Sequence, residues 1–190
     1  MGLFASPKGW IVGSFELKSP SGSVRYNPTS GEPLGVSISA EWLSASTCPV
    51  LESAPDAMLE SRATGPATFS SDAQFIVVVE KEGIYARLAE DCFFDKVPCI
   101  VVTGKGVPDL ATRACVRVLS STLSIPVLGL CDCNPYGLGV LMAYRQGGKL
   151  TTVSSHLYSS DIRWLGLRPS QVAKISKDLP DVVFQELSSR

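Results

Sequence analysis

The stretch VLGLCDCNPYGLGVLMAY, residues 127–144, decides the fold that this sequence predicts. Its apolar beginning, Val127–Cys131, is typical of a buried parallel strand that is covered on both faces. A turn with Asp132 and Asn134 follows. Pro135 then indicates the start of a helix, because proline is favoured at the first helical position. The sequence therefore predicts a strand, a polar turn and a helix in direct succession.

The turn admits two interpretations. If the backbone is still extended there, Asp132 and Asn134 point to the same side, because successive side chains of a strand alternate. Two oxygen ligands at the carboxyl end of a strand suit a hard cation such as Mg²⁺, and ligands bind at this edge of open α/β sheets. In the structural alternative, Asn134 caps the helix and Asp132 adds negative charge near its N-terminus.

The composition is that of a globular chain. Its 190 residues are 45% hydrophobic and 18% charged, which is enough for one domain with a sizeable core. The formal net charge of −1 gives no overall basic signal for nucleic acid, so DNA contacts have to come from local clusters or from other parts of the protein. No apolar run approaches the roughly 18–20 residues that span a bilayer, so we expect no membrane association.

The six cysteines do not form a recognisable zinc site. Only Cys131 and Cys133 are closely spaced, and no second close pair completes a ligand set. Most of the others lie in apolar runs, where cysteine behaves as a small hydrophobic residue. No signal peptide is visible, so we expect free thiols in a reducing, intracellular environment.

The chain divides into three predicted parts. Residues 1–43 alternate short apolar pieces with turns rich in Gly, Ser and Pro, which indicates short strands. Residues 44–71 show no sustained period and predict a linker or a poorly ordered insertion. Residues 72–190 contain the alternating strands and helices and are expected to form the main domain.

The third part predicts a parallel α/β sheet. Apolar runs indicate strands at 75–80, 98–106, 127–131 and 161–169, and helical spacing indicates helices at 83–94, at 108–123, from 135 and at 170–175. Strand–helix–strand repeats with short links imply parallel strands covered by helices. The first and third strands end in Glu80 and Asp132, and the second ends in a loop with Lys105. All three residues therefore reach the same edge of the sheet.

Four motifs in this order resemble one known family: FIVVVEKEGIY (75–85), VVTGKGVPDLATR (101–113), GLCDCNPYG (129–137) and IRWLGLRPS (162–170). The family comprises the A-type chain of topoisomerase VI and its meiotic relatives, which make the programmed DNA double-strand breaks that start recombination. The upstream ASPKGWIVG resembles the segment that precedes the metal-binding domain in the meiotic branch. The resemblance covers about residues 3–17 and 72–175, and the ordered set of motifs is highly specific.

The resemblance implies an α/β fold of the Toprim type, a Rossmann-like parallel sheet flanked by helices and preceded by short strands and a loose linker. Glu80 matches the first acid of the family, and Asp132 matches the first Asp of its D-x-D motif. Asn134 departs from the second Asp. The resemblance thus implies a Mg²⁺ site of Glu80, Asp132 and Asn134, in which the amide oxygen ligates without adding negative charge. We expect this departure to weaken metal binding without abolishing it.

The reaction implied by the resemblance is a transesterification, in which a tyrosine hydroxyl attacks a DNA phosphodiester and stays linked to a 5′ end. A carboxylate-held Mg²⁺ would stabilise the charge that builds on the phosphoryl oxygens and on the leaving 3′ oxygen. Lys105 and Arg113 would contact phosphate by charge-assisted hydrogen bonds, with Gly104 and Gly106 allowing close approach of the backbone. The alternative for Arg113 and Arg117 is a solvated helix face.

The nucleophilic tyrosine is expected outside this sequence. In the family it lies in a winged-helix domain before the matched region, and no such motif surrounds the tyrosines present, which are Tyr26, Tyr85, Tyr136, Tyr144 and Tyr158. The resemblance therefore implies a fragment, an incomplete gene model or a truncated product of a nuclear protein. It also implies double-stranded DNA as a partner, a homodimer or a heterodimer with a related A-type subunit, and a topoisomerase VI B-like subunit.

Two other functions stay open at this point. The chain is alternatively a non-catalytic DNA-binding or assembly module derived from the same family, in which Asn134 reflects lost chemistry. A Toprim enzyme of another kind, such as a primase or a nuclease, is a weaker alternative, because GKGxPDxATR (104–113) argues against it.

Overall fold

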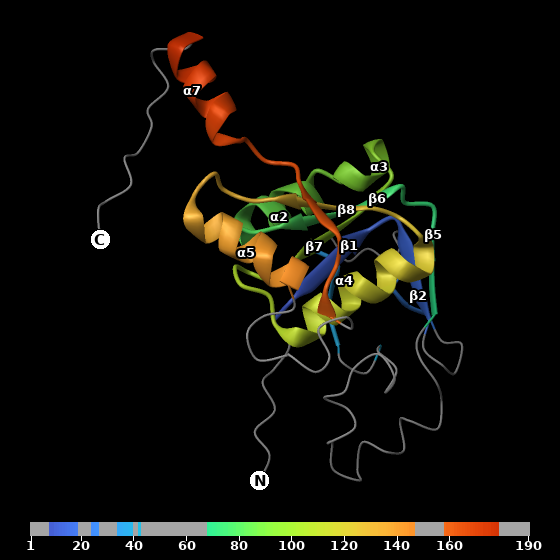
Figure 1. The fold of residues 1–190 in the computed structure, drawn as a ribbon. Helices are drawn as coiled ribbons and strands as arrows, with labels where there is room; N and C mark the ends of the chain where they lie inside the picture. Colours follow the sequence, from blue (N-terminus) through green and yellow to red (C-terminus); the bar gives the residue numbers. More distant parts are fainter. Residues whose placement is uncertain are drawn as a thin grey trace.

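The computed structural model describes residues 8–18, 24–26, 34–39, 42, 68–146 and 158–178, which form two sheets and the helices around them (Figure 1). The larger sheet has the strand order β4–β1–β7–β6–β8–β9, and the smaller one the order β3–β2–β5. The large sheet consists of β1 (Trp10–Gly13), β4 (Val36–Ser37), β6 (Phe75–Val79), β7 (Cys99–Thr103), β8 (Val127–Leu130) and β9 (Ile162–Trp164). The small sheet consists of β2 (Phe15–Lys18), β3 (Val24–Tyr26) and β5 (Thr68–Ser71).

The centre of the large sheet is parallel. β6 lies between β7 and β8, so that Val79 is opposite Thr103 on one side and Leu130 on the other. β9 pairs in parallel with β8. Every residue of β7 is buried, as expected for a strand with helices on both faces. The predicted mostly parallel α/β sheet is therefore confirmed.

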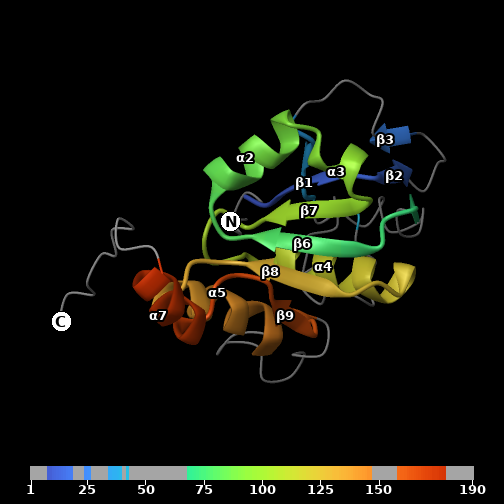
Figure 2. The ribbon, with the colours of Figure 1, turned by 90° about the horizontal axis from the view of Figure 1, so that it is seen from above.

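Helices cover both faces of this sheet. They are α2 (Glu82–Glu90), α3 (Phe93–Lys96), α4 (Leu110–Leu123) and α5 (Pro135–Gln146), and a further helix, α7 (Pro169–Asp178), follows β9. The chain moves from β6 to β7 in one direction and from β7 through β8 to β9 in the other. Because parallel crossovers are right-handed, α2 and α3 lie on one face and α4 and α5 on the other (Figures 1 and 2). α7 stands away from the sheet (Figure 1).

Two predicted elements end earlier than expected, the helix at 83–94 and the strand at 161–169. The helix predicted over 83–94 is two helices, because Cys92 adopts a left-handed backbone with φ of 46° between α2 and α3. The second predicted strand ends at Thr103, and the expected Gly-Lys-Gly loop follows it, where Lys105 and Gly106 have positive φ and bend the chain. The strand predicted over 161–169 is limited to Ile162–Trp164.

Two of the four N-terminal strands, β1 and β4, are part of the large sheet. β1 pairs antiparallel with β7, with Ile11 opposite Val102, and β4 pairs antiparallel with β1. β1 therefore covers an edge of β7 that would otherwise expose its backbone groups. The expected linker at 44–71 ends in a strand, β5, while residues 43–67 lie outside the described part.

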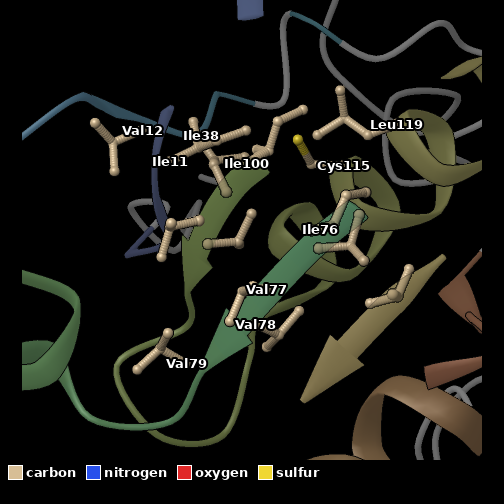
Figure 3. Close-up of a cluster of buried hydrophobic side chains, with 14 of the residues drawn as sticks. Ile11, Val12, Ile38, Ile76, Val77, Val78, Val79, Ile100, Cys115 and Leu119 are labelled. Carbon is tan, nitrogen blue, oxygen red and sulfur yellow. The ribbon is translucent and has the colours of Figure 1, made fainter. Parts of the chain in front are cut away.

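The hydrophobic core on the α4 side of the sheet is formed by Ile38, Ile76 and Ile100 together with Cys115 and Leu119 of α4 (Figure 3). All five are fully buried. Their positions explain the spacing of apolar residues in α4, because one face of that helix contacts the sheet.

We expect Ile100→Ala to lower the free energy of unfolding by about 2–5 kcal/mol, because truncation of a fully buried isoleucine leaves a cavity. Urea unfolding followed by circular dichroism measures this loss. Ile84→Ala is the matched control: Ile84 is 47% exposed, and its truncation should cost less than about 0.5 kcal/mol. Equal losses for the two variants would contradict this assignment of the core.

Asp109 caps the N-terminus of α4. Its carboxylate accepts hydrogen bonds from the backbone N–H of Thr112 at 2.8 Å and of Lys8 at 3.0 Å. Burial alone would raise the pKa of Asp109, but the hydrogen bonds from Thr112 and Lys8 outweigh it and hold the pKa below its ordinary value. The charged carboxylate therefore stabilises the folded chain.

We expect Asp109→Ala to cost about 1 kcal/mol of stability at pH 7, the usual worth of an N-cap. Because the folded-state pKa is lowered, this contribution is present above the unfolded pKa of about 4 and is lost as the pH falls through the folded value. Urea unfolding at pH 7 and pH 3 should therefore show a smaller difference between the two proteins at pH 3. A difference that grows at low pH would be inconsistent with the cap.

Candidate functional site

The carboxyl ends of β6 and β8 bring Glu80 and Asp132 together. Both strands end at the same edge, and the Glu80 N–H donates to the Leu130 carbonyl at 3.1 Å. Oε2 of Glu80 then accepts a hydrogen bond from the backbone N–H of Asp132 at 2.9 Å, although 52 residues separate them in sequence. The parallel pairing of the two strands thus places one acidic side chain against the other acidic residue.

Helix α5 fixes the position of Asp132 from the other side. A Cβ atom on Gly137 would lie 2.3 Å from the carbonyl oxygen of Asp132, so only glycine allows the first turn of α5 to pack this closely. The backbone of Asp132 is therefore held between the end of β8 and the start of α5.

Asn134 is the N-cap of α5. Its Oδ1 accepts a hydrogen bond from the Gly137 N–H at 2.9 Å, as the structural interpretation of the turn expects. The metal-binding interpretation assumed an extended backbone that points the side chains of Asp132 and Asn134 to the same side. β8 instead ends at Leu130, and the chain bends at residues 133 and 134. An amide oxygen has two lone pairs, so the cap leaves one of them free.

Lys81 forms an ion pair with Asp132, one of the candidate metal ligands. Its Nζ lies 2.7 Å from Oδ2 of Asp132, and this hydrogen bond raises the pKa of the Lys81 ammonium. A pocket of about 230 Å³ opens at this position and is lined by Val79, Glu80, Lys81, Ile84, Leu130, Cys131 and Asp132. The edge therefore carries a small hollow that contains two carboxylates and one ammonium group.

Lys105 lies at the same edge, in the loop between β7 and α4. The N–H of Gly106 donates to the carbonyl of Glu80 at 2.9 Å, which attaches the loop to the end of β6. Nζ of Lys105 lies 2.7 Å from Oε1 of Glu82 and 5.3 Å from the centroid of the Trp10 ring. Lys105 therefore lies at the edge of the sheet where Glu80 and Asp132 lie, as the order of the strands predicts.

The two glycines around Lys105 have different surroundings. A Cβ on Gly104 would lie 2.8 Å from Cα of Pro108, so glycine at this position lets the loop pack closely against Pro108. Gly106 has φ of 91° and open space where a Cβ would be. Only Gly106 leaves room for another molecule at its backbone.

Arg113, in the first turn of α4, is buried. It is 7% exposed, its Nη1 donates to the Ala143 carbonyl at 3.3 Å, and its guanidinium lies 5.7 Å from the centroid of the Tyr158 ring. Burial lowers the pKa of this group. The surroundings favour a packing role between α4 and α5, whereas Arg117 is exposed, as expected for a solvated helix face.

Sequence reasoning assigned no role to Lys81 or Gly137. Both stand in motifs that signalled the fold, one directly after Glu80 and the other three residues after Asn134. The position of Lys81 next to Glu80 did not indicate its ion pair with Asp132, because the pair joins the end of β6 to the end of β8. Gly137 could have been suspected as a close-approach position, since glycine within a helix is otherwise unfavourable.

Four of the five tyrosines are buried, namely Tyr26, Tyr85, Tyr144 and Tyr158. Burial raises the pKa of Tyr85 and Tyr144 above its ordinary value, which disfavours the phenolate. Tyr136, in the first turn of α5, is 81% exposed. The buried tyrosines are therefore packing residues.

The ranges that the structure describes contain no group of three His, Cys, Asp or Glu side chains that could hold a metal. Within the same ranges, no helix has the length and apolarity to cross a membrane. The cysteines there are free thiols. His156, the single histidine, lies outside them.

Comparison with known proteins matches residues 75–188 to the family model for the Toprim domain of Spo11 and the topoisomerase 6 A subunit. The A subunit of DNA topoisomerase 6 from Arabidopsis thaliana is 50% identical over 105 residues, which cover 55% of this chain and 25% of that protein. Meiotic recombination protein SPO11-2 of Oryza sativa subsp. indica is 44% identical over 123 residues, which cover 64% of this chain and 31% of that protein. Meiotic recombination protein SPO11 of Mus musculus is 44% identical over 108 residues, which cover 56% and 27%.

The chain spans about a quarter to a third of the length of these relatives. One of them is named as a topoisomerase subunit, and the other two are named as meiotic recombination proteins. The matched region contains Glu80, Asp132, Asn134 and Lys105. Since the family model covers more than half of the chain, the protein belongs to the family of Spo11 and the topoisomerase VI A subunit, and residues 75–188 are its Toprim domain.

Proposed function

We propose that this chain is the Mg²⁺-binding Toprim part of a DNA-breaking transesterase of the topoisomerase VI A type that forms meiotic double-strand breaks. The observation that carries the proposal is the contact between the Glu80 carboxylate and the Asp132 backbone at the ends of two neighbouring parallel strands. It places two acidic residues in one solvent-accessible pocket at the edge of the sheet where α/β proteins bind ligands.

The donor set of this pocket fits Mg²⁺. The ion is usually held by one or two carboxylates and keeps several waters, so Glu80 and Asp132 meet its minimum requirement. Oε2 of Glu80 is bonded to the Asp132 amide, which leaves Oε1 for a cation. Asn134 would add its free lone pair directly or through water. When bound, the ion would stabilise negative charge that builds on a phosphodiester during cleavage.

Lys105 is the residue that we propose for contact with DNA phosphate. Its ammonium lies beside Glu82 and Trp10, at the edge that carries Glu80, and a phosphate would replace Glu82 as its partner. Gly106 next to it leaves space for a backbone approach. The burial of Arg113 favours a supporting role, in which it holds α4 against α5.

We propose that the remaining parts of the reaction come from other domains or subunits. The nucleophilic tyrosine would be supplied by a winged-helix domain, in the same polypeptide or in a second A-type subunit, and a topoisomerase VI B-like subunit would complete the assembly. We further propose double-stranded DNA as the substrate, the nucleus as the location, and residues 72–190 as the Toprim unit. β1 and β4 extend the sheet of that unit from the N-terminal side.

Isothermal titration with MgCl₂ should detect binding to the folded chain and should show at least about tenfold weaker binding for the Glu80→Ala, Asp132→Ala double variant, which lacks both carboxylates. The matched control is the Glu90→Ala, Asp91→Ala double variant. It removes the same charge from an exposed position at the end of α2 and should keep the original affinity. Equal affinity of all three proteins would refute the site.

Asn134→Asp should raise the Mg²⁺ affinity about three- to tenfold, because a carboxylate adds the negative charge that the amide lacks. Aspartate caps helices as well as asparagine does, so the thermal midpoint should stay within a few degrees. The same titration gives the affinity, and a melting curve gives the stability. Unchanged affinity in a folded variant would mean that residue 134 lies outside the ion's reach.

The second candidate function is a non-catalytic DNA-binding module. It is favoured by Asn134, which replaces an acid of the family motif and whose oxygen is used as a helix cap. DNA binding that falls with salt but is unaffected by MgCl₂, in a chain without measurable Mg²⁺ binding, would support this second function.

A further inference from the structure

We propose that Lys81 is the counter-ion of the metal-free site. Its ammonium holds one carboxylate oxygen of Asp132, competes with Mg²⁺ for that carboxylate, and so limits the affinity of the site for the ion. The inference rests on the proposed function, because it assumes that the Glu80–Asp132 pocket is where the cation binds. It assigns a role to Lys81, which contacts the proposed metal ligand Asp132 but would not bind the metal itself.

The contact between the two side chains is direct. Nζ of Lys81 lies 2.7 Å from Oδ2 of Asp132, within the range of a charge-assisted hydrogen bond. Both residues line the pocket that also contains Glu80. A cation that takes the same carboxylate oxygen has to displace the ammonium, because two positive charges cannot share that position at no cost.

The charges around the pocket explain why the lysine is held there. Glu80 lies against the backbone of Asp132, so two negative carboxylates face one hollow. The other nearby charges, Glu82 of α2 and Lys105 of the loop after β7, form an ion pair with each other at 2.7 Å. Lys81 is therefore the cation that offsets the two carboxylates among the residues described at this edge.

The backbone of Lys81 stays in place when its side chain moves. Lys81 immediately precedes α2, and its carbonyl accepts a hydrogen bond from the Tyr85 N–H at 3.1 Å. Its side chain makes no capping hydrogen bond and is 59% exposed. The ammonium can therefore leave Asp132 without removing a hydrogen bond of the helix.

The test is titration of the full chain with MgCl₂ alone, at low ionic strength, for the original protein and for Lys81→Gln. Removal of the competing ammonium should tighten binding about three- to tenfold, a modest effect because exposed ion pairs are weak and screened by salt. The gain should shrink when the ionic strength is raised. Lys81→Arg, which keeps the charge and the pair, should bind Mg²⁺ no more tightly than the original chain.

Arg87→Gln is the matched control. Arg87 lies in the last turn of the same helix and pairs with Asp91 at 2.9 Å, so the substitution removes one positive charge without touching Asp132. It should leave the Mg²⁺ affinity within about twofold of the original value, because its charge is remote and screened. Melting curves of all variants establish that each is folded.

The outcomes separate the two proposals. Tighter binding for Lys81→Gln, but for neither Lys81→Arg nor Arg87→Gln, supports the counter-ion role. Equal affinity of Lys81→Gln and the original chain overturns the role of Lys81 and leaves the metal site standing. Absence of binding in both overturns the metal site, and the inference about Lys81 falls with it.

Discussion

The parallel pairing of β6 with β8 is the constraint on which the rest of the site depends. Neither strand is a sequence neighbour of the other, since β7 and α4 come between them along the chain. Their register sets Val79 opposite Leu130, and the next residues continue the contact until the Glu80 carboxylate meets the Asp132 amide. A shift of one residue would turn one of the two acids toward the opposite face of the sheet. The apolar side chains that bury both strands therefore also determine where the acids lie.

Opposite charges are paired within the site itself. Lys81 contacts Asp132, and Lys105 contacts Glu82, so the acidic edge is largely neutralised by lysines of the same edge. This arrangement offsets the repulsion between the carboxylates that line this edge. It also means that each proposed ligand, a cation at Asp132 or a phosphate at Lys105, would exchange with a partner that is already present.

The sequence was sufficient to predict the elements that continuous apolar runs define. β6, β7 and β8 form the buried centre of the sheet, so their composition alone distinguishes them, and parallel order then places Glu80, Lys105 and Asp132 at one edge. The pairing of β1 with β7 was not predictable, because a short apolar piece does not specify its partner. The burial of Arg113 and the direction of Asn134 also depend on neighbours from other elements, which composition and spacing do not reveal.

The position of β1 has a consequence for how the sheet is assembled during synthesis. β1 leaves the ribosome long before β7, and the two strands pair across a long stretch of sequence, with Gly13 opposite Ile100. Because proteins are synthesised from the N-terminus, β1 has already been synthesised when β7 emerges from the ribosome. Once β1 and β7 have paired, this edge of β7 is no longer free for a strand of another molecule to add to it.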